Sequence, residues 1–401
     1  MDVEDDVGLP LEGIRVVELA DRIGAYCGKL LADIGADVVK VELPTGDDLR
    51  RTPPLRRGGP DGESGLLFAY YHNNKRGITL DWTVPDALPI LERLCGTADV
   101  VLISPDVRRP IVGFSDERPH LSWLQPDTLL CAITPFGLVG PWRHWRATPF
   151  TSFAASGQMF SVGPVAGPPV AMPGQQLYDQ TSTRAAAAVE AVLRGAPGQR
   201  HQIIDISAHH VGAWQQMMLN QYTVAGRIQT RATNFGPPPG GGWQCRDGFV
   251  DVAAHGPHHW DLFVEMLGHP EELSDELYRD RGIRTQLFDM LTAMIEVHMR
   301  EQSAPDFVER AQALGLPCSL MYRPEEFVTD AQPRSRNTFV EVQHPVLGAL
   351  RMPGPSIRST VPLVRYRRPA PTLGQFNREV YVDELGFDSS DLKVWSARGL
   401  V

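Results

Sequence analysis

Asp179 is the residue of this sequence whose type and position most directly indicate chemistry. It stands just ahead of residues 183–194, an alanine-rich run typical of a helix, which Gly195 and Pro197 then end. A carboxylate at a helix N-terminus is stabilised as the anion by the helix dipole and by free backbone amides, by roughly 0.3–1 kcal/mol when exposed. Such a group stays ionised and can act as a nucleophile at neutral pH. Asp is also a common N-cap residue, and residue type alone leaves that plain structural role open.

Three consecutive glycines, Gly240, Gly241 and Gly242, form a second candidate. Without a Cβ they let backbone amides approach a ligand closely, and they let the segment move as a lid or an oxyanion-binding loop requires. The prolines at 237–239 stiffen one side, so a hinge would lie at the glycines. The same composition also suits an interdomain linker.

Two basic pairs could hold a phosphate-rich ligand. Lys75 and Arg76 precede an expected strand, and Arg108 and Arg109 lie in a loop that follows another. In open α/β sheets, ligands bind beyond the carboxyl ends of the strands, where Arg and Lys can pair with phosphates. Short basic clusters are also common on solvated surfaces, so these pairs alone do not decide the ligand.

Several other chemistries lack their motifs. The glycines of segment 23–28 have the wrong spacing for the dinucleotide fingerprint GxGxxG, and neither a Walker loop nor a GxSxG elbow is present. The histidines form no HExxH pattern, and the cysteines form no CxxC pair. The sequence therefore predicts neither a metal site nor an NAD site. The cysteines are dispersed and odd in number: Cys27, Cys95, Cys131, Cys245 and Cys318.

Net charge and hydropathy limit the classes of partner that the protein is expected to bind. The 38 Lys and Arg against 48 Asp and Glu give a net charge of −10, which argues against a nucleic-acid backbone as the main partner. No apolar run approaches the roughly 18 residues that span a bilayer, and the start, MDVEDDVG, is acidic where a secretory signal is basic. We expect a soluble, cytoplasmic protein that binds neither nucleic acid nor membrane.

Strand and helix patterns alternate through the first 200 residues. Strands are expected at 14–19, 36–42, 77–81, 98–104, 129–134 and 202–207, with helices at 26–34 and 85–95 between them. This alternation predicts an α/β class, with a Rossmann-like, doubly wound parallel sheet. Beyond the proline- and glycine-rich run 236–242, the strand 249–254 and the helices 260–267 and 285–300 predict a smaller α+β domain.

Several short motifs occur in order along nearly the whole chain. They are Leu11–Leu19, Leu30–Glu42, Asn74–Asp81, Thr134–Gly137 with Gly140–Pro141, Cys245–Val250, and Val340–Pro345 with Leu347–Gly348. Together they closely resemble the class III, or CaiB/BaiF-type, CoA-transferases, a family that also contains formyl-CoA transferase and the α-methylacyl-CoA racemases. The resemblance implies an interlocked homodimer. It implies domains at 1–225 (large, CoA-binding, first part), 226–325 (small, with the glycine run at its start) and 326–401 (returning to the large domain).

The resemblance also changes the interpretation of Asp179. In the family, an Asp before a helix attacks an acyl-CoA thioester to give a mixed anhydride, and CoA thiolate then returns to give an aspartyl-CoA thioester. Tyr178 to Ser182 falls on that segment, with Thr183 where the family has glycine. Asp179 is thus the expected nucleophile of an acyl-CoA:carboxylate CoA-transferase. Gly240–Gly242 resembles the mobile glycine loop that shields the anhydride from water.

The residues that the resemblance places at CoA are Arg22, Ile23, Gly24, Lys75, Arg76, Leu80, Asp81, Ser104 and Arg108. The run 104–109 departs from the family's Asn-Phe-Arg-Pro-Gly-like segment, because an aromatic contact is missing and an arginine pair stands in its place. A degenerate CoA-binding or regulatory protein without turnover is therefore a second hypothesis. Residues 146–150 carry neither the His nor the Asp of the racemases, which makes a 2-methylacyl-CoA racemase the third.

Overall fold

Two compact units make up the chain, one drawn from residues 1–160, 170–227 and 337–401 and the other from 161–169 and 228–336. The structure is a computed structural model. It describes residues 8–105, 110–115, 120–121, 124–125, 127–164, 166–195, 200, 202–215, 222–226, 231, 236–254 and 256–401. The chain thus leaves the first unit briefly at residues 161–169, leaves it again after residue 227, and returns to it at residue 337.

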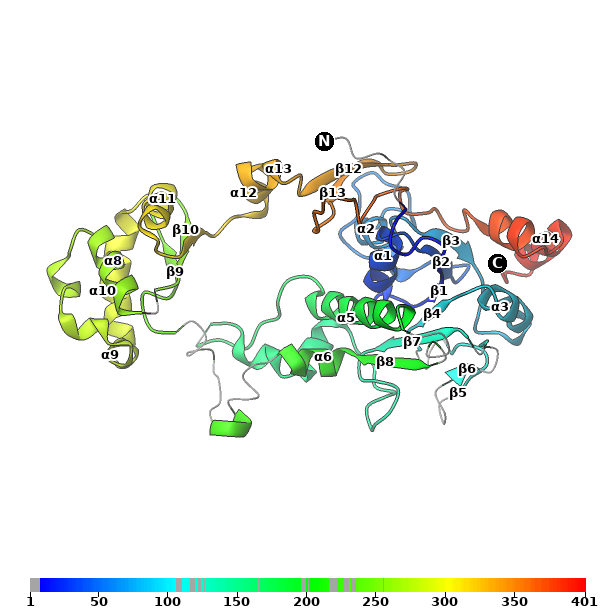
Figure 1. Ribbon diagram of the computed structural model, residues 1–401, viewed down its shortest axis with the longest axis horizontal. Helices are drawn as coiled ribbons and strands as arrows, with labels where there is room; N and C mark the ends of the chain where they lie inside the picture. Colours follow the sequence, from blue (N-terminus) through cyan, green and yellow to red (C-terminus); the bar gives the residue numbers. More distant parts are fainter. Residues whose placement is uncertain are drawn as a thin grey trace. The chain divides into compact units, whose positions relative to one another are not determined.

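A six-stranded parallel sheet organises the first unit (Figure 1). Its strands are β1 (Arg15–Leu19), β2 (Asp37–Glu42), β3 (Arg76–Thr79), β4 (Val100–Ile103), β7 (Leu129–Thr134) and β8 (Ile203–Ser207). Their spatial order is β3-β2-β1-β4-β7-β8, and every neighbouring pair is parallel. β4 and β7 are buried along their whole length, as strands covered on both faces must be. The predicted α/β class and doubly wound sheet are confirmed.

The strand order reverses between β1 and β4, because the chain adds β2 and β3 on one side of β1 and the later strands on the other. In doubly wound sheets, the crevice beyond the carboxyl ends of the strands at this reversal is where ligands bind. The topology therefore predicts a ligand site at the loops that follow Leu19 and Ile103.

Helices cover both faces of this sheet. They are α1 (Ala25–Asp33), α2 (Leu66–Tyr71), α3 (Leu88–Cys95), α4 (Pro149–Ala155), α5 (Gln176–Leu193) and α6 (Ala208–Gln215), with short 3₁₀ turns at Asp48–Arg50, Pro85–Ala87 and Gln158–Ser161. α3 shares one core with Val17, Val39 and Val101. Glu18 alternates to the opposite face, where Gly28 of α1 lies directly against it. A two-strand hairpin, β5 (Phe114–Ser115) with β6 (His120–Leu121), was not expected from the sequence.

The C-terminal segment completes the first unit. It forms the hairpin β12 (Phe339–His344) and β13 (Gly348–Pro353), a π-helical segment (Glu379–Glu384) and α14 (Ser389–Ala397). Asn377 accepts a hydrogen bond from the Thr79 backbone N–H at 2.8 Å, and the hydroxyl of Tyr381 donates to the Thr79 carbonyl at 2.8 Å. These contacts cover the edge strand β3, which would otherwise expose unpaired backbone groups.

The second unit is an α+β domain, as expected. Its antiparallel sheet has the order β11-β10-β9, made of β9 (Gly241–Gln244), β10 (Phe249–Val252) and β11 (Cys318–Leu320). Its helices are α8 (Pro257–Met266), α9 (Arg281–Gln286), α10 (Phe288–Glu301), α11 (Ala304–Leu314), α12 (Pro324–Thr329) and α13 (Ala331–Ser335), with 3₁₀ turns at Glu271–Leu273 and Glu276–Arg279. Trp260, Phe263 and Phe307 centre its apolar core.

The glycine run differs from its expected form as a loop. Gly241 and Gly242 open strand β9 and pair with Val252 and Asp251 of β10. Gly241 has φ of +118°, which favours glycine, and a Cβ on Gly242 would approach the sulfur of Met321 to 3.1 Å. Local sheet geometry and packing thus account for these two glycines, and only Gly240 lies in the preceding turn.

Candidate active site

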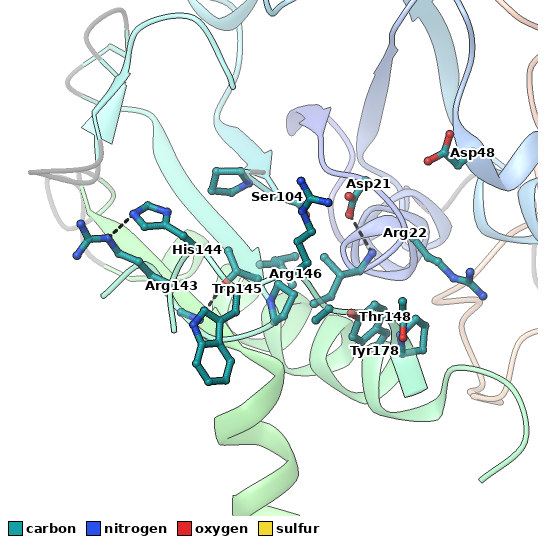
Figure 2. A pocket seen from close by; sticks show the side chains of 18 of the residues that line it. Asp21, Arg22, Asp48, Ser104, Arg143, His144, Trp145, Arg146, Thr148 and Tyr178 are labelled. Carbon is teal, nitrogen blue, oxygen red and sulfur yellow. Dashed lines mark hydrogen bonds between the residues drawn. The ribbon is translucent and has the colours of Figure 1, made fainter. Parts of the chain in front are cut away.

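A cavity of about 400 Å³ lies at the carboxyl ends of β1 and β4. Asp21, Arg22 and Ile23 follow β1, and Ser104 follows β4. Figure 2 shows Asp21, Arg22 and Ser104 in the lining. This position is the strand-order reversal, where a parallel sheet leaves room for a ligand. Tyr178, the residue before Asp179, also lines the cavity.

Basic and aromatic side chains from the loop after β7 line the same cavity. Arg143, His144, Trp145 and Arg146 follow one another in its wall. Arg146 reaches toward the loop that carries Asp21, whereas Arg143 and His144 lie together at the other side of the cavity (Figure 2). Arg143 Nε donates to His144 Nε2 at 2.8 Å. Guanidinium groups in this position can pair with phosphates or carboxylates.

The indole rings of this loop form a stacked pair. Trp142 and Trp145 stack with ring centroids 4.7 Å apart and planes 20° from parallel. Phe136 meets both edge-on, at 5.7 and 6.1 Å. Trp145 is nonetheless 57% exposed, so one large aromatic surface remains open to a planar ligand group.

Asp179 lies within the first turn of α5, not ahead of the helix as the sequence predicts. The helix begins at Gln176, and the backbone N–H of Asp179 already donates to the Gln175 carbonyl at 3.1 Å. Its carboxylate is therefore not an N-cap. Side chains replace the free backbone amides that the sequence suggests as partners for this group.

Two side-chain donors converge on one oxygen of the Asp179 carboxylate. The Tyr71 hydroxyl donates to Oδ1 at 3.0 Å, and the Gln175 amide donates to the same Oδ1 at 3.2 Å. Within the described residues, no hydrogen bond falls on Oδ2. Burial raises the pKa of Asp179 above its usual range, while the hydrogen bonds from Gln175 and Tyr71 and the charge of Arg22 oppose that rise. The carboxylate is half-buried, with one oxygen held and the other available.

Arg22 orients the amide of Gln175. Arg22 Nε donates to Gln175 Oε1, so the amide nitrogen of Gln175 faces Asp179. The assignment is unambiguous because a guanidinium only donates and a carboxylate only accepts. Arg22, expected at a phosphate, thus lines the cavity and also holds the Asp179 site.

Lys75 and Arg76, expected as phosphate ligands, lie elsewhere. Lys75 is fully buried, and its Nζ donates to Glu18 Oε2 at 2.7 Å and to the Ala25 carbonyl at 2.8 Å. Arg76 pairs with Asp37, Glu379 and Glu384. Both cations are engaged in internal ion pairs, and the structure does not support a CoA contact at either.

The remaining expected contacts divide into two groups. Ile23 and Ser104 line the cavity, and Ser104 Oγ is buried with no hydrogen-bond partner among the described residues. Leu80 is fully buried in the core beside α3, and Asp81 accepts from the backbone and hydroxyl of Thr83, as a turn residue does. Neither Leu80 nor Asp81 lines the cavity.

Three expected contacts stand apart from this cavity. Gly24 caps α1, where a Cβ would approach that of Ala20 to 2.5 Å, so its absence of a side chain serves packing. Arg108 lies outside the described residues. Gly240, Gly241 and Gly242 belong to the second unit, and their relation to Asp179 stays a prediction.

The sequence did not indicate four residues of the site, which are Tyr71, Gln175, Arg143 and Arg146. Gln175 precedes Asp179 by four residues, so an earlier start of the predicted helix would have placed both on one face. Tyr71 gives no local signal, because it lies 108 positions before Asp179 in the sequence.

Among the described residues, no group of three or more His, Cys, Asp or Glu side chains could hold a metal ion. No described helix is long and apolar enough to cross a membrane.

The chain is similar to known proteins along nearly its whole length. The family model "CoA-transferase family III" matches residues 11–377. The chain is 30% identical over 389 residues to a succinate–glutarate CoA-transferase of Agrobacterium fabrum, covering 93% of this chain and 95% of that protein. It is 28% identical to a succinyl-CoA–D-citramalate CoA-transferase of Chloroflexus aurantiacus, covering 98% of each. A solved CaiB/BaiF family protein from Brucella suis has the same fold, with a TM-score of 0.81 at 23% identity over 94% of this chain and 100% of that one.

Proposed function

Because the chain belongs to CoA-transferase family III, we propose that it moves CoA from an acyl-CoA to a free carboxylic acid, with Asp179 as covalent nucleophile. The observation that carries the proposal is the Asp179 carboxylate, whose Oδ1 is held by two donors and whose Oδ2 accepts no hydrogen bond from the described residues. An oriented carboxylate with one open oxygen is suited to attack a thioester.

The proposed reaction has four steps in which Asp179 alternates between two covalent forms. Oδ2 attacks the acyl carbon of the donor, the carbon–sulfur bond breaks, and CoA thiolate leaves a mixed anhydride. The thiolate then attacks Cγ of Asp179 and expels the donor acid, which gives an aspartyl-CoA thioester. The acceptor carboxylate attacks the same Cγ and expels thiolate, and that thiolate finally takes the acceptor's acyl group and restores the carboxylate.

The cavity at β1 and β4 is the proposed binding place of CoA. Arg143 and Arg146 line it and offer charge for the phosphates, and Ser104 offers a hydroxyl without a partner among the described residues. The open face of Trp145 suits stacking with adenine. Tyr178 lines the cavity, and Asp179 is the next residue of α5, although it is not itself among the lining residues.

The substrates to assay first follow from the relatives. Their names give succinate, glutarate and D-citramalate as the acids that they exchange. We therefore choose succinyl-CoA as the first donor and glutarate as the first acceptor, within a wider panel of acyl-CoAs and acids. New thioesters would be detected by mass spectrometry.

Replacing Asp179 tests the proposal directly. Asp179→Ala removes the nucleophile, and we expect transfer to fall by at least about 10⁴-fold with an unchanged circular-dichroism spectrum. Hydroxylamine should convert Asp179 of the wild type, incubated with acyl-CoA, to its hydroxamate. The matched control is Gln180→Ala, which changes the next, exposed residue of α5 and should keep wild-type rates. Transfer by Asp179→Ala at the wild-type rate would sink the mechanism.

A CoA-binding protein without turnover remains the rival function, favoured by the altered run 104–109. Calorimetry that detects CoA binding, combined with no transfer across the whole panel, would support that rival. Racemisation of a 2-methylacyl-CoA would reveal itself by deuterium exchange at the α-carbon, which we do not expect because residues 146–150 hold no His–Asp couple.

A further inference from the structure

Tyr71 and Gln175 meet at one oxygen, and this convergence has a chemical consequence for the covalent forms of Asp179. Both donors reach Oδ1, so the oxygen that attacks the acyl-CoA is Oδ2. In the anhydride and in the aspartyl-CoA thioester, Oδ1 is then the carbonyl oxygen of the Asp179 acyl group. When thiolate or acceptor carboxylate attacks Cγ, the electron pair of that carbonyl moves onto Oδ1, and the leaving group departs when it returns.

We propose that the Tyr71 hydroxyl and the Gln175 amide form an oxyanion hole for the acyl carbon of Asp179. The inference rests on the proposed function, since it requires the covalent forms of Asp179. Donors fixed in advance around an oxygen that gains charge stabilise the transition state more than the ground state. The two steps that they accelerate are the attacks on Cγ, one by thiolate and one by the acceptor acid.

Both donors are held in place before any substrate binds. Gln175 is buried, and its Oε1 accepts from Arg22, so its amide cannot turn without leaving the guanidinium unpaired at that atom. Tyr71 is buried between the rings of Tyr26, at 5.7 Å edge-on, and Tyr70, at 5.5 Å. Burial, and then the charge of Asp179, raises the pKa of the Tyr71 hydroxyl far above neutrality, which keeps its proton available for donation.

Two backbone amides of the first turn of α5 cannot take the place of these side chains. The backbone N–H of Asp179 donates to the Gln175 carbonyl, and that of Tyr178 donates to the same carbonyl at 2.8 Å. These two amides are thus already used inside the first turn. Arg22 is a positioning residue in this arrangement, because its described contact is with Gln175 and not with the carboxylate.

Rapid-quench mass spectrometry of the wild-type protein, Tyr71→Phe and Gln175→Leu tests the proposal. Mixed with one equivalent of succinyl-CoA, each protein is quenched over time, and the succinyl and CoA adducts of the Asp179 peptide are quantified. Formation of the anhydride places no negative charge on Oδ1, so we expect it near the wild-type rate in both variants. Conversion to the CoA adduct should slow by about 10²-fold or more in each, and the succinyl adduct should accumulate.

Tyr278→Phe is the control, since it removes a hydroxyl from a residue of the second unit whose ring packs against Trp260. It should convert the adducts at wild-type rates. Conversion to the CoA adduct at the wild-type rate in Tyr71→Phe and Gln175→Leu would overturn the oxyanion hole. Equal slowing of anhydride formation and of conversion would also overturn it, because it would indicate a general disturbance of the site. Absence of any Asp179 adduct in the wild type would instead overturn the proposed function beneath it.

Discussion

Single residues set the reactivity of Asp179 by opposing effects. Burial disfavours the charged carboxylate, whereas Gln175, Tyr71 and Arg22 favour it. Burial prevails, so the pKa is raised rather than held low by the helix terminus as expected from the sequence. A carboxylate with a raised pKa is the stronger nucleophile once ionised, because its negative charge is less stabilised by its surroundings. The surrounding donors limit the rise in the pKa of Asp179 and so favour its ionised form at neutral pH.

The pH dependence of the reaction should report this balance. Only the carboxylate attacks, so kcat/KM should fall on the acid side with a midpoint above the roughly 3.9 of an ordinary Asp. Tyr71→Phe removes one hydrogen bond that lowers the pKa of Asp179, and its midpoint should move to still higher pH. Profiles of kcat/KM against pH for both proteins check the sign. A midpoint that moves to lower pH in Tyr71→Phe would contradict the assignment of that hydrogen bond.

At the scale of elements, a buried charge network joins the first strands to α1. Glu18 of β1 accepts from Lys75 at 2.7 Å and lies 3.7 Å from Nζ of Lys40 on β2, and all three side chains are buried. Gly28 of α1 allows this approach, because a Cβ there would overlap Glu18 Oε2 at 1.7 Å. The network supports the loop after β1, which carries Arg22. Lys75 is therefore engaged in this buried network, which does not support its expected role as a CoA contact.

Removing Lys75 should cost stability. Lys75→Met leaves Glu18 buried beside one remaining, more distant cation, and we expect the free energy of unfolding to fall by about 3 kcal/mol. The double variant Glu18→Met, Lys75→Met should recover a large part of that loss, since no uncompensated carboxylate remains. Lys393→Met, at an exposed position of α14, serves as the control. Urea unfolding gives the values, and a Lys75→Met protein as stable as the control would show that the network contributes nothing.

At the scale of the whole molecule, the fold was more predictable than the site. Fully buried parallel strands appear in a sequence as apolar runs, so the predicted strand 129–134 has the observed bounds of β7. The start of α5 was missed because Gln175 and Gln176 carry no capping signal. The meeting of Tyr71 with Asp179 could not be predicted from local pattern, because tertiary packing alone brings two such distant segments together.

The assembled state belongs to this scale as well. The family resemblance implies an interlocked homodimer, and large apolar side chains stand exposed on the single chain, with Trp214 71% and Val224 88% exposed. We expect light scattering to give twice the chain mass of 44.3 kDa. A concentration-independent monomer mass would contradict the expected dimer.

The covalent chemistry of Asp179 is the centre of this account, and one measurement tests it most directly. Wild-type protein and Asp179→Ala would be quenched after mixing with succinyl-CoA, digested and analysed by peptide mass spectrometry. We predict that CoA becomes attached through a thioester to Asp179 of the wild type, that added glutarate discharges it as glutaryl-CoA, and that Asp179→Ala gains no CoA. Glutaryl-CoA formation by the wild type without CoA ever residing on Asp179 would contradict the account.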